Sequence, residues 1–509
     1  MIRFSPLGVK VIRALPRIAR VRSPLSARAA NLTDAIFVIA PENAQPRAFA
    51  QLPEAQRWRE LHARDKARTG TVRSTTLANE RQTHAVLGYL APEASPFERL
   101  ALAGRMLKEV APRAVDTVAL TALVDRSTNA AALESLLAAT FAHAFALPSF
   151  RSSRDTRKAL REISLIDGDE VDIRRASAAA RGNNLVRWLT ALPPNKLDAN
   201  AYRRVIAEIA RDNRLSMRWL DEQQLRRLGA NAFLAVAAAN DERGAGIAHL
   251  RYRPRANKRE PDVALVGKGI IFDTGGVNLK PHKHMLDMHM DMSGSAVALA
   301  TLVALAELRV PFAVDAWLAI TENRIGPHGY KPQDVIRASN GVTIQVIHTD
   351  AEGRMALADT LALAGRTKPR LMIDYATLTG ASVYALTERM SSVLTNRPAL
   401  AEKLVAAGRA SGERVWNFPF DADYDSDLES KVADIIQCSV DGKGDHILAT
   451  RFLSRFVPDD VAWAHVDLSS VSRSGGLGHV NTDLTGFGIR FTLEALLNQN
   501  LLDGLERKK

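Results

Sequence analysis

Two segments of the sequence gather charged side chains among glycines and apolar residues. The longer one, residues 263–296, contains Lys268, Asp273, Lys280 and Asp291. This stretch is too apolar and too rich in glycine to be a solvated face. We therefore expect these four charges to face partners in a partly buried site, where the glycines let the backbone turn sharply or approach a ligand.

The shorter segment, residues 347–359, supplies more carboxylates. Asp350 and Glu352 lie two residues apart, just before Gly353, and Arg354 opens a helix with an apolar face. Together the two segments are expected to bring four carboxylates and three cations to one place. Crowded carboxylates in a partly buried site repel one another and take up protons unless a cation neutralises them.

Two divalent ions would balance the charge of four carboxylates. Hard oxygen ligands without cysteine favour Zn²⁺, Mn²⁺ or Mg²⁺ over a soft-metal site. A pair of such ions, roughly 3.5–4 Å apart, can hold and activate one bridging water. The residue types and their spacing therefore predict a hydrolase that uses two metal ions.

The size and composition of the chain limit its class. At 509 residues the chain is too long for one ordinary core, so two domains are expected. Hydrophobic residues make up 46%, and no apolar run approaches the ~20 residues that a bilayer span needs, so we expect no membrane insertion. The single cysteine, Cys438, excludes a disulfide framework and fits a reducing, cytoplasmic compartment.

The formal charge of +12 is concentrated in the N-terminal part of the chain. Residues 1–190 contain 29 Lys and Arg against 18 Asp and Glu, which leaves 39 against 38 of the totals of 68 and 56. An alternative to an enzyme is therefore a DNA-binding protein or a scaffold that uses this basic half, with or without hydrolase activity. No nucleic-acid motif accompanies the charge.

The first 33 residues are basic, with no acidic residue before Asp34. We interpret residues 1–33 as a disordered arm, and the alternatives are a targeting peptide or a tail for an anionic partner. The seven basic residues of this arm are Arg3, Lys10, Arg13, Arg17, Arg20, Arg22 and Arg28.

The remaining pattern predicts two α/β domains. Residues 34–175 alternate short apolar strands with helical stretches, one of them at 156–163, and indicate a small α/β domain. A linker helix is expected at 176–191 and should end before Pro193, since proline lacks an amide hydrogen and restricts the residue before it. Residues 192–509 are expected to form the larger, catalytic domain.

The elements expected to position the site lie in that larger domain. A buried strand at 263–266 leads into the first charged segment, a helix is predicted at 293–308 and a strand at 311–319. A hairpin is expected to turn at Asn340 and Gly341. This alternation predicts a mixed sheet covered by helices, with ligands at the carboxyl ends of its strands.

The motifs of this part resemble the leucyl aminopeptidase family, the M17 metallopeptidases. The resemblance extends in order over residues ~180–495 and has a low false-positive risk for its length. It rests on VGKGIIFDTGGVNLKP, ENRIGPHGYKPQDV, TDAEGR, DYATLTGA, WAHVDL and TGFGIR, among others. The resemblance implies an aminopeptidase that acts on peptides and assembles as a homohexamer.

The resemblance also implies the metal ligands. Lys268, Asp273, Asp291 and Glu352 would hold one ion, and Asp273, Asp350 and Glu352 the other, with zinc or manganese as the metals. A lysine ligand must be neutral, which proximity to a dication enforces by making the protonated form costly. Without the resemblance, Lys268 would be interpreted as a salt-bridge partner.

Two further residues have catalytic roles in the family. The resemblance implies that Lys280 polarises the scissile carbonyl, while Arg354 holds a bicarbonate that takes the proton from the attacking water. The α-amine of the substrate would bind a metal ion and Asp291, which limits the reaction to terminal residues. The pocket for a leucine-like side chain would be bordered by Met288, Thr377, Gly380 and Ala381, of which Ala381 is equally well interpreted as core packing.

Some positions depart from the family pattern. The segment 442–447, GKGDHI, replaces a more glycine-rich stretch, and its Asp445 or His446 can reshape substrate selection. Smaller departures, none of which removes a ligand, are His348, Asn278 and the Ser293–Gly294–Ser295 turn. Three neighbouring histidines, His282, His284 and His289, are interpreted as parts of a solvated loop because the carboxylate set is already complete.

Overall fold

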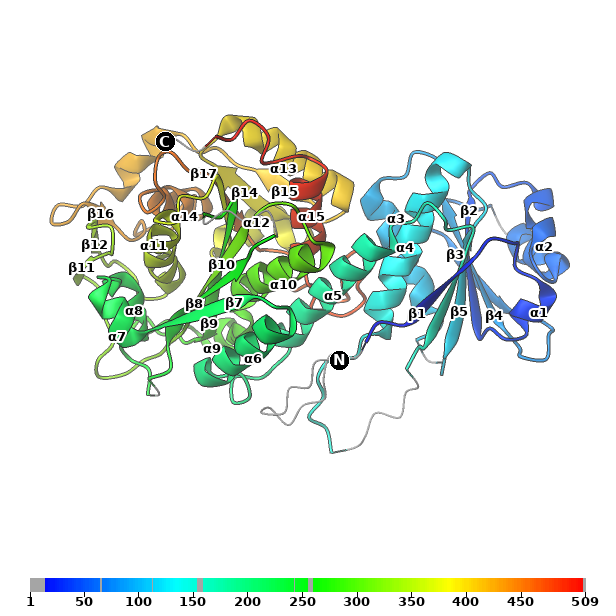
Figure 1. Cartoon of the computed structure of the whole chain (residues 1–509), viewed down its shortest axis with the longest axis horizontal. Helices are drawn as coiled ribbons and strands as arrows, with labels where there is room; N and C mark the ends of the chain where they lie inside the picture. The colour runs from blue at the N-terminus through cyan, green and yellow to red at the C-terminus, as the bar shows by residue number, and fades with distance from the viewer. Residues whose placement is uncertain are drawn as a thin grey trace.

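The computed structural model of the chain describes residues 14–64, 66–111, 113–152, 159–241, 243–254 and 260–506. Two large sheets, each with helices packed beside it, lie in separate halves of the molecule (Figure 1). The N-terminal sheet has the strand order β1-β6-β5-β2-β4-β3, and the C-terminal sheet has the order β15-β14-β17-β13-β9-β10-β8-β7. The predicted two-part α/β fold with a mixed sheet is confirmed.

The N-terminal sheet is parallel except at one edge, where β3 runs antiparallel to β4. One face of the sheet packs on the helices α3 and α4, and the other face packs on α2. The elements of this half are β1 (Arg17–Val21), α1 (Ala27–Ala30), β2 (Ala35–Pro41), α2 (Ala55–Ala63), β3 (Val72–Thr76), β4 (His84–Leu90), α3 (Pro96–Lys108), β5 (Thr117–Ala122), α4 (Arg126–Ala144) and β6 (Glu162–Ile166).

The expectation of a disordered arm over residues 1–33 is wrong for its described part. Arg17–Val21 form β1, which pairs in parallel with β6. Ile18 packs against the core, and the guanidinium of Arg20 donates to the carbonyl oxygens of Asp169 and Val171 at 2.8 and 2.7 Å. Strand β1 therefore pairs with β6, although the basic composition of this segment suggested disorder. Residues 1–13 lie outside the described residues.

The helix predicted at 156–163 is also wrong where the structure describes it. Glu162–Ile166 form β6, which pairs with β1 and β5 on its two sides. Ile163 and Leu165 are fully buried, so alternate residues face the core as in a strand. Residues 153–158 of the predicted helix lie outside the described residues.

A single long helix, α5 (Ile173–Thr190), runs between the two sheets (Figure 1). It begins three residues before the predicted start at 176, because the side chain of Asp172 accepts a hydrogen bond from the backbone amide of Arg175 and caps the helix. The helix packs on α4 of the N-terminal half and on α10 of the C-terminal half.

The four central strands of the C-terminal sheet, β17, β13, β9 and β10, are parallel. On one side β8 and β7 continue the sheet with antiparallel pairings, and on the other β14 is antiparallel to β17 and pairs in parallel with the edge strand β15. Its strands are β7 (Ser216–Asp221), β8 (Gly246–Tyr252), β9 (Val263–Asp273), β10 (Val314–Asn323), β13 (Leu371–Ala376), β14 (Ser391–Thr395), β15 (Val415–Asn417) and β17 (Ala462–Asp467). Its helices are α6 (Ala199–Asp212), α7 (Glu222–Arg227), α8 (Asn231–Ala237), α9 (His282–Met285), α10 (Ser293–Leu308), α11 (Glu352–Gly365), α12 (Gly380–Leu386), α13 (Pro398–Ser411), α14 (Asp445–Ser454) and α15 (Ile489–Leu497).

The central strand β9 is buried on both faces. Val263 and Leu265 pack in the core that contains α10, whereas Ala264 and Val266 pack in the core that contains α11. A parallel strand covered on both sides reads as a continuous apolar run, which explains the pattern before Gly267. The stretch His282–Leu308 is long and apolar enough to cross a membrane, but 78% of its apolar window is buried, as in a core helix.

A small third sheet completes the fold beside the large one. It consists of β11 (Val335–Arg337), β12 (Thr343–Gln345) and β16 (Ile435–Ile436). The antiparallel pairing of β11 and β12 confirms the predicted hairpin, and Gly341 adopts a φ of 96° in its turn.

Candidate active site

The site lies at the carboxyl ends of the central parallel strands. Asp273 ends β9 and Asn323 ends β10, and the two residues face each other in the strand register. Asp467 ends β17, and Thr377 follows directly after β13. Parallel strands deliver their last residues to one edge of the sheet, so the topology brings together side chains that are far apart in the sequence.

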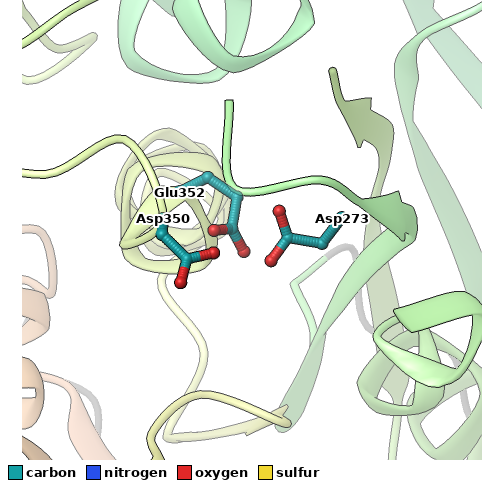
Figure 2. Close-up of side chains that lie close together, drawn as sticks. All are labelled: Asp273, Asp350 and Glu352. Atoms are coloured by element: carbon teal, nitrogen blue, oxygen red, sulfur yellow. The ribbon is translucent and has the colours of Figure 1, made fainter. Parts of the chain in front are cut away.

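Three carboxylates converge at this edge, as Figure 2 shows. Each of Asp273, Asp350 and Glu352 offers an oxygen atom, and these oxygens all lie within 4.8 Å of one another. Asp273 is 2% exposed and Glu352 1% exposed. Glu352 is the first residue of α11, where the free amide groups of the helix favour a negative charge.

A buried lysine links this cluster to a fourth carboxylate. Lys268 lies within β9, and its Nζ is 2.8 Å from Asp291 Oδ1 and 3.0 Å from Glu352 Oε1. The same Nζ donates to the carbonyl oxygen of Thr377 at 2.9 Å. Burial lowers the pKa of Lys268, but the surrounding carboxylates raise it by more and keep it above its ordinary value.

The second lysine reaches the cluster from the loop after β9. Nζ of Lys280 lies 2.9 Å from Asp273 Oδ2 and also contacts Asp350 Oδ1. This loop depends on Gly275, which has a φ of 87° and whose position leaves no room for a Cβ, since that atom would lie 2.5 Å from the carbonyl oxygen of Asn278. The glycine therefore allows the chain to turn back and bring Lys280 over the carboxylates.

The electrostatics of the cluster favour a further cation. When all four carboxylates are ionised, they face two lysines and leave an excess of two negative charges. Burial raises the pKa of Glu352 to about 8 and that of Asp291 to about 6, and the nearby Asp273 carboxylate adds to both rises. Among the described residues, Oδ2 of Asp291 has no hydrogen-bond partner.

These observations fit a site for divalent metal ions. The oxygens of Asp273, Asp350 and Glu352 are close enough for one ion to contact all three. Lys268 lies between Asp291 and Glu352, so its amine and the two carboxylates could bind the same ion. An ion that took over the carboxylates would remove the ion pairs that keep this lysine protonated.

Arg354 stands beside the cluster rather than in it. The residue lies on the first turn of α11 and is 2% exposed. Its Nη2 donates to Asp445 Oδ2 at 2.7 Å, and its Nη1 donates to the carbonyl oxygen of Gln437 at 3.2 Å. The first turn of α11 thus carries an acid toward the cluster and a guanidinium toward α14.

A cavity of about 430 Å³ opens onto the cluster. Nine of the residues predicted for the site line it, namely Lys268, Asp273, Lys280, Met288, Asp291, Asp350, Glu352, Thr377 and Gly380. Two predicted residues, Arg354 and Ala381, are not among its lining residues. Leu378, Val383, Leu468 and Val471 add apolar surface to the wall.

The neighbouring histidines lie away from the carboxylates. His282 and His284 are exposed on the short helix α9, whereas His289 is half-buried. The three are absent from the described groups of side chains that can hold a metal ion.

Sequence reasoning missed two residues, Asn323 and Tyr330, that support the carboxylate cluster. Asn323 donates from Nδ2 to Asp273 Oδ1 at 2.8 Å and to the carbonyl oxygen of Thr349 at 3.1 Å. The hydroxyl of Tyr330 donates to the same carbonyl oxygen at 2.9 Å. Asn323 and Tyr330 belong to the ENRIGPHGYKPQDV motif. The motif marks this segment as part of the family resemblance, but it assigns no role to either residue.

Comparisons with known proteins agree with this geometry. The cytosol aminopeptidase family, catalytic domain, matches residues 184–493. A protein named "Probable cytosol aminopeptidase" from Synechococcus sp. (strain CC9605) is 38% identical over 358 residues, which are 69% of this chain and 72% of that protein. A protein of the same name from Syntrophotalea carbinolica is 39% identical over 332 residues, and the match spans 65% of this chain and 66% of that protein.

Two solved structures resemble most of the chain, in both of its halves. A mutant of tomato leucine aminopeptidase superposes with a TM-score of 0.84 at 26% identity, covering 95% of this chain and 97% of the tomato chain. The bottromycin maturation enzyme BotP in complex with Mn superposes with a TM-score of 0.80 at 29% identity, covering 92% of this chain and 100% of the other. The likeness therefore includes the N-terminal half as well as the part that the family matches.

Proposed function

The chain belongs to the cytosol aminopeptidase family and is a metalloaminopeptidase, and we propose that it uses two divalent ions to release N-terminal residues from peptides. The observation that carries this proposal is the buried carboxylate cluster of Asp273, Asp350 and Glu352 at the floor of an open cavity. Zinc and manganese are the proposed metals, and the manganese in the BotP structure supports the second.

We take the ligand sets from the family resemblance, and the contacts at the cluster support them. One ion would be held by Lys268, Asp273, Asp291 and Glu352, and the other by Asp273, Asp350 and Glu352. When bound, the ions would polarise the scissile carbonyl and make an attacking water acidic enough to lose its proton.

The remaining side chains would orient the peptide. Asp291 has a carboxylate oxygen without a partner among the described residues, and this oxygen can accept a hydrogen bond from the substrate's α-amine. Lys280 lines the cavity and would donate to the carbonyl oxygen as negative charge develops there. A site that binds the free amine selects a terminal residue, which gives exopeptidase action.

The wall of the cavity supports a preference for leucine-like residues. Met288, Thr377 and Gly380 line it together with apolar neighbours, so a branched apolar side chain would be desolvated there. Ala381 does not line the cavity, and we propose that it packs behind the wall.

Arg354 would hold an anion beside the two ions. This anion is either an exchangeable bicarbonate or a carboxylate of the chain.

From the family we further propose that residues 192–509 form the catalytic domain and that the protein is a cytoplasmic homohexamer. Light scattering on the purified protein would test the hexameric state. The DNA-binding or scaffold alternative is not favoured, since the relatives are named as aminopeptidases.

The test is a set of aminoacyl amides assayed after metal removal and reconstitution. We expect no turnover by the chelated protein, recovery with Mn²⁺ or Zn²⁺, and faster cleavage of leucine amide than of glycine or aspartate amide. An N-acetylated leucine amide should not be cleaved, since it lacks the free amine. Cleavage of the acetylated substrate, or full activity after chelation, would contradict the proposal.

A further inference from the structure

The guanidinium of Arg354 is among the most deeply buried charges of the molecule. The side chain is 2% exposed, and a charge removed from water to this extent is costly unless an anion pairs with it. Among the described residues, the carboxylate paired with this guanidinium is that of Asp445, at 2.7 Å. The charge of Arg354 is thus balanced by the chain itself.

The fold delivers Asp445 to this place. Gly444 adopts a φ of 62° and turns the chain into α14, of which Asp445 is the first residue. A carboxylate at the N-terminus of a helix is stabilised by the free amide groups there. Helix α14 packs against α11, which carries Arg354, so the ion pair joins the starts of two neighbouring helices.

One oxygen of this carboxylate remains available. Oδ2 of Asp445 accepts from Arg354, whereas Oδ1 is buried and has no hydrogen-bond partner among the described residues. A buried carboxylate oxygen without a hydrogen-bond donor costs free energy. Such unpaired groups are typical of functional positions, whereas a purely structural ion pair would have both oxygens paired. Arg354 itself lies two residues after Glu352, on the same helical turn.

The position of Asp445 conflicts with an exchangeable anion at Arg354. Nη2 of the guanidinium already donates to Asp445, and Nη1 donates to the carbonyl oxygen of Gln437. A bicarbonate on the same guanidinium would meet a second negative charge in a buried place, where like charges are poorly screened. The segment 442–447 is also where the chain departs from the glycine-rich pattern of its family.

We propose that Asp445 is the resident anion of Arg354 and replaces a bound bicarbonate, so that peptide hydrolysis by this protein needs no added bicarbonate. The inference rests on the proposed peptidase function. In this role Oδ2 of Asp445 fixes the guanidinium, and Oδ1, which has no hydrogen-bond partner among the described residues, accepts the proton that the attacking water loses.

The first test measures bicarbonate binding without a substrate. Thermal unfolding of the full-length protein is followed in sodium bicarbonate and in sodium chloride of equal ionic strength, at one pH. We expect Asp445→Ala to gain stability from bicarbonate, by about 2 °C at a tenfold excess over its dissociation constant. The wild type should show no such gain. Asp441→Ala, which removes an exposed acid paired with Lys443 in the same loop, is the matched control and should behave like the wild type.

The second test measures chemical rescue. In buffer freed of carbon dioxide, the wild-type kcat should not depend on bicarbonate, whereas kcat of Asp445→Ala should fall at least tenfold and recover as bicarbonate is added. The KM for leucine amide should change little. Asp445→Ser, which keeps a polar group at the first turn of α14, replaces the alanine variant if that variant unfolds.

Three results would overturn the inference: equal bicarbonate stimulation of wild type and variant, an Asp445→Ala protein that is fully active without bicarbonate, or a loss that bicarbonate does not restore. A wild type without peptidase activity would instead contradict the proposed function. The melting experiment would still decide the role of Asp445 in that case, since it requires no turnover.

Discussion

Asn323 and Asp273 face each other at the ends of two parallel strands, and the amide of Asn323 donates a 2.8 Å hydrogen bond to the Asp273 carboxylate. Asn323 is fully buried, and its Nδ2 also lies 3.5 Å from Glu352 Oε2. One amide thus orients both carboxylates that are proposed to bridge the two ions.

Replacement of this amide should weaken metal binding. In Asn323→Ala the two carboxylates lose the donor that fixes their orientation, and we expect metal affinity to fall by about 10–100-fold. Metal titration of the chelated protein measures the effect. Asn396→Ala is the control, because Asn396 also makes side-chain hydrogen bonds in this sheet, but to the backbone of Val461 and Trp463 and not to a carboxylate of the cluster. Equal metal affinity in both variants would show that Asn323 has no special role.

Removal of Lys280 should slow the reaction without emptying the metal site. We expect Lys280→Ala to lower kcat by about 10²–10³-fold, the usual effect of losing one donor to a developing oxyanion, while the metal content stays at the wild-type value. Lys283→Ala removes an exposed lysine from the same loop and should leave kcat unchanged. Loss of metal in Lys280→Ala would instead make Lys280 part of the metal site's framework.

The cavity wall offers a test of substrate preference at Gly380. A Cβ at this position would meet its nearest neighbour, Tyr384 Cε2, at 3.9 Å, so the backbone tolerates a side chain. Gly380→Val should narrow the cavity and lower kcat/KM for leucine amide about 10–100-fold more than for alanine amide. Ala381→Val is the matched control, since Ala381 does not line the cavity. The same change in preference from both variants would place Ala381 in the pocket as well.

A buried acid far from the metal cluster should make stability depend on pH. Oε2 of Glu413 accepts hydrogen bonds from the backbone amides of Gly488 and Phe491 at 2.9 and 2.8 Å, at the start of α15. Burial raises the pKa of Glu413 to about 7, although these bonds act in the opposite direction. Because the folded-state pKa exceeds the ordinary value, the stabilising contribution is present below about pH 4.5 and is lost as the pH rises through 7.

Glu413→Gln removes this titration and keeps an oxygen that accepts both bonds. The variant should match the wild type near pH 4 and exceed it at pH 8, by roughly 1–3 kcal/mol in the free energy of unfolding. Denaturant unfolding at several pH values measures the difference. An identical pH dependence in the two proteins would show that Glu413 keeps its ordinary pKa.

Local patterns in the sequence were sufficient to predict many of the helices and strands of the C-terminal half. The helix predicted at 293–308 coincides with α10, and the ends of β9 and the start of α11 place Asp273 and Glu352 as the motifs indicated. These predictions depend on residues close together in the chain, where apolar periodicity and glycine punctuation are direct signals.

The residues that were missed depend on pairing between distant segments. Asn323 supports Asp273 only through the register of β9 and β10, which no single segment reveals. Asp445 was noted as a departure from the family, but its contact with Arg354 requires the packing of α14 on α11. Strand β1 was not predicted because its arginines interrupt the apolar pattern of a strand. An edge strand can carry such charged residues because one of its sides faces solvent.

The pairing of β1 with β6 has a consequence for attempts to produce a shortened protein. A version that starts after Val21 would leave the backbone groups of β6 open along a strand whose Ile163 and Leu165 are built for the interior. Exposed backbone donors and acceptors of this kind recruit strands from other molecules. Trimming the basic N-terminal segment past Arg17 should therefore favour insoluble material.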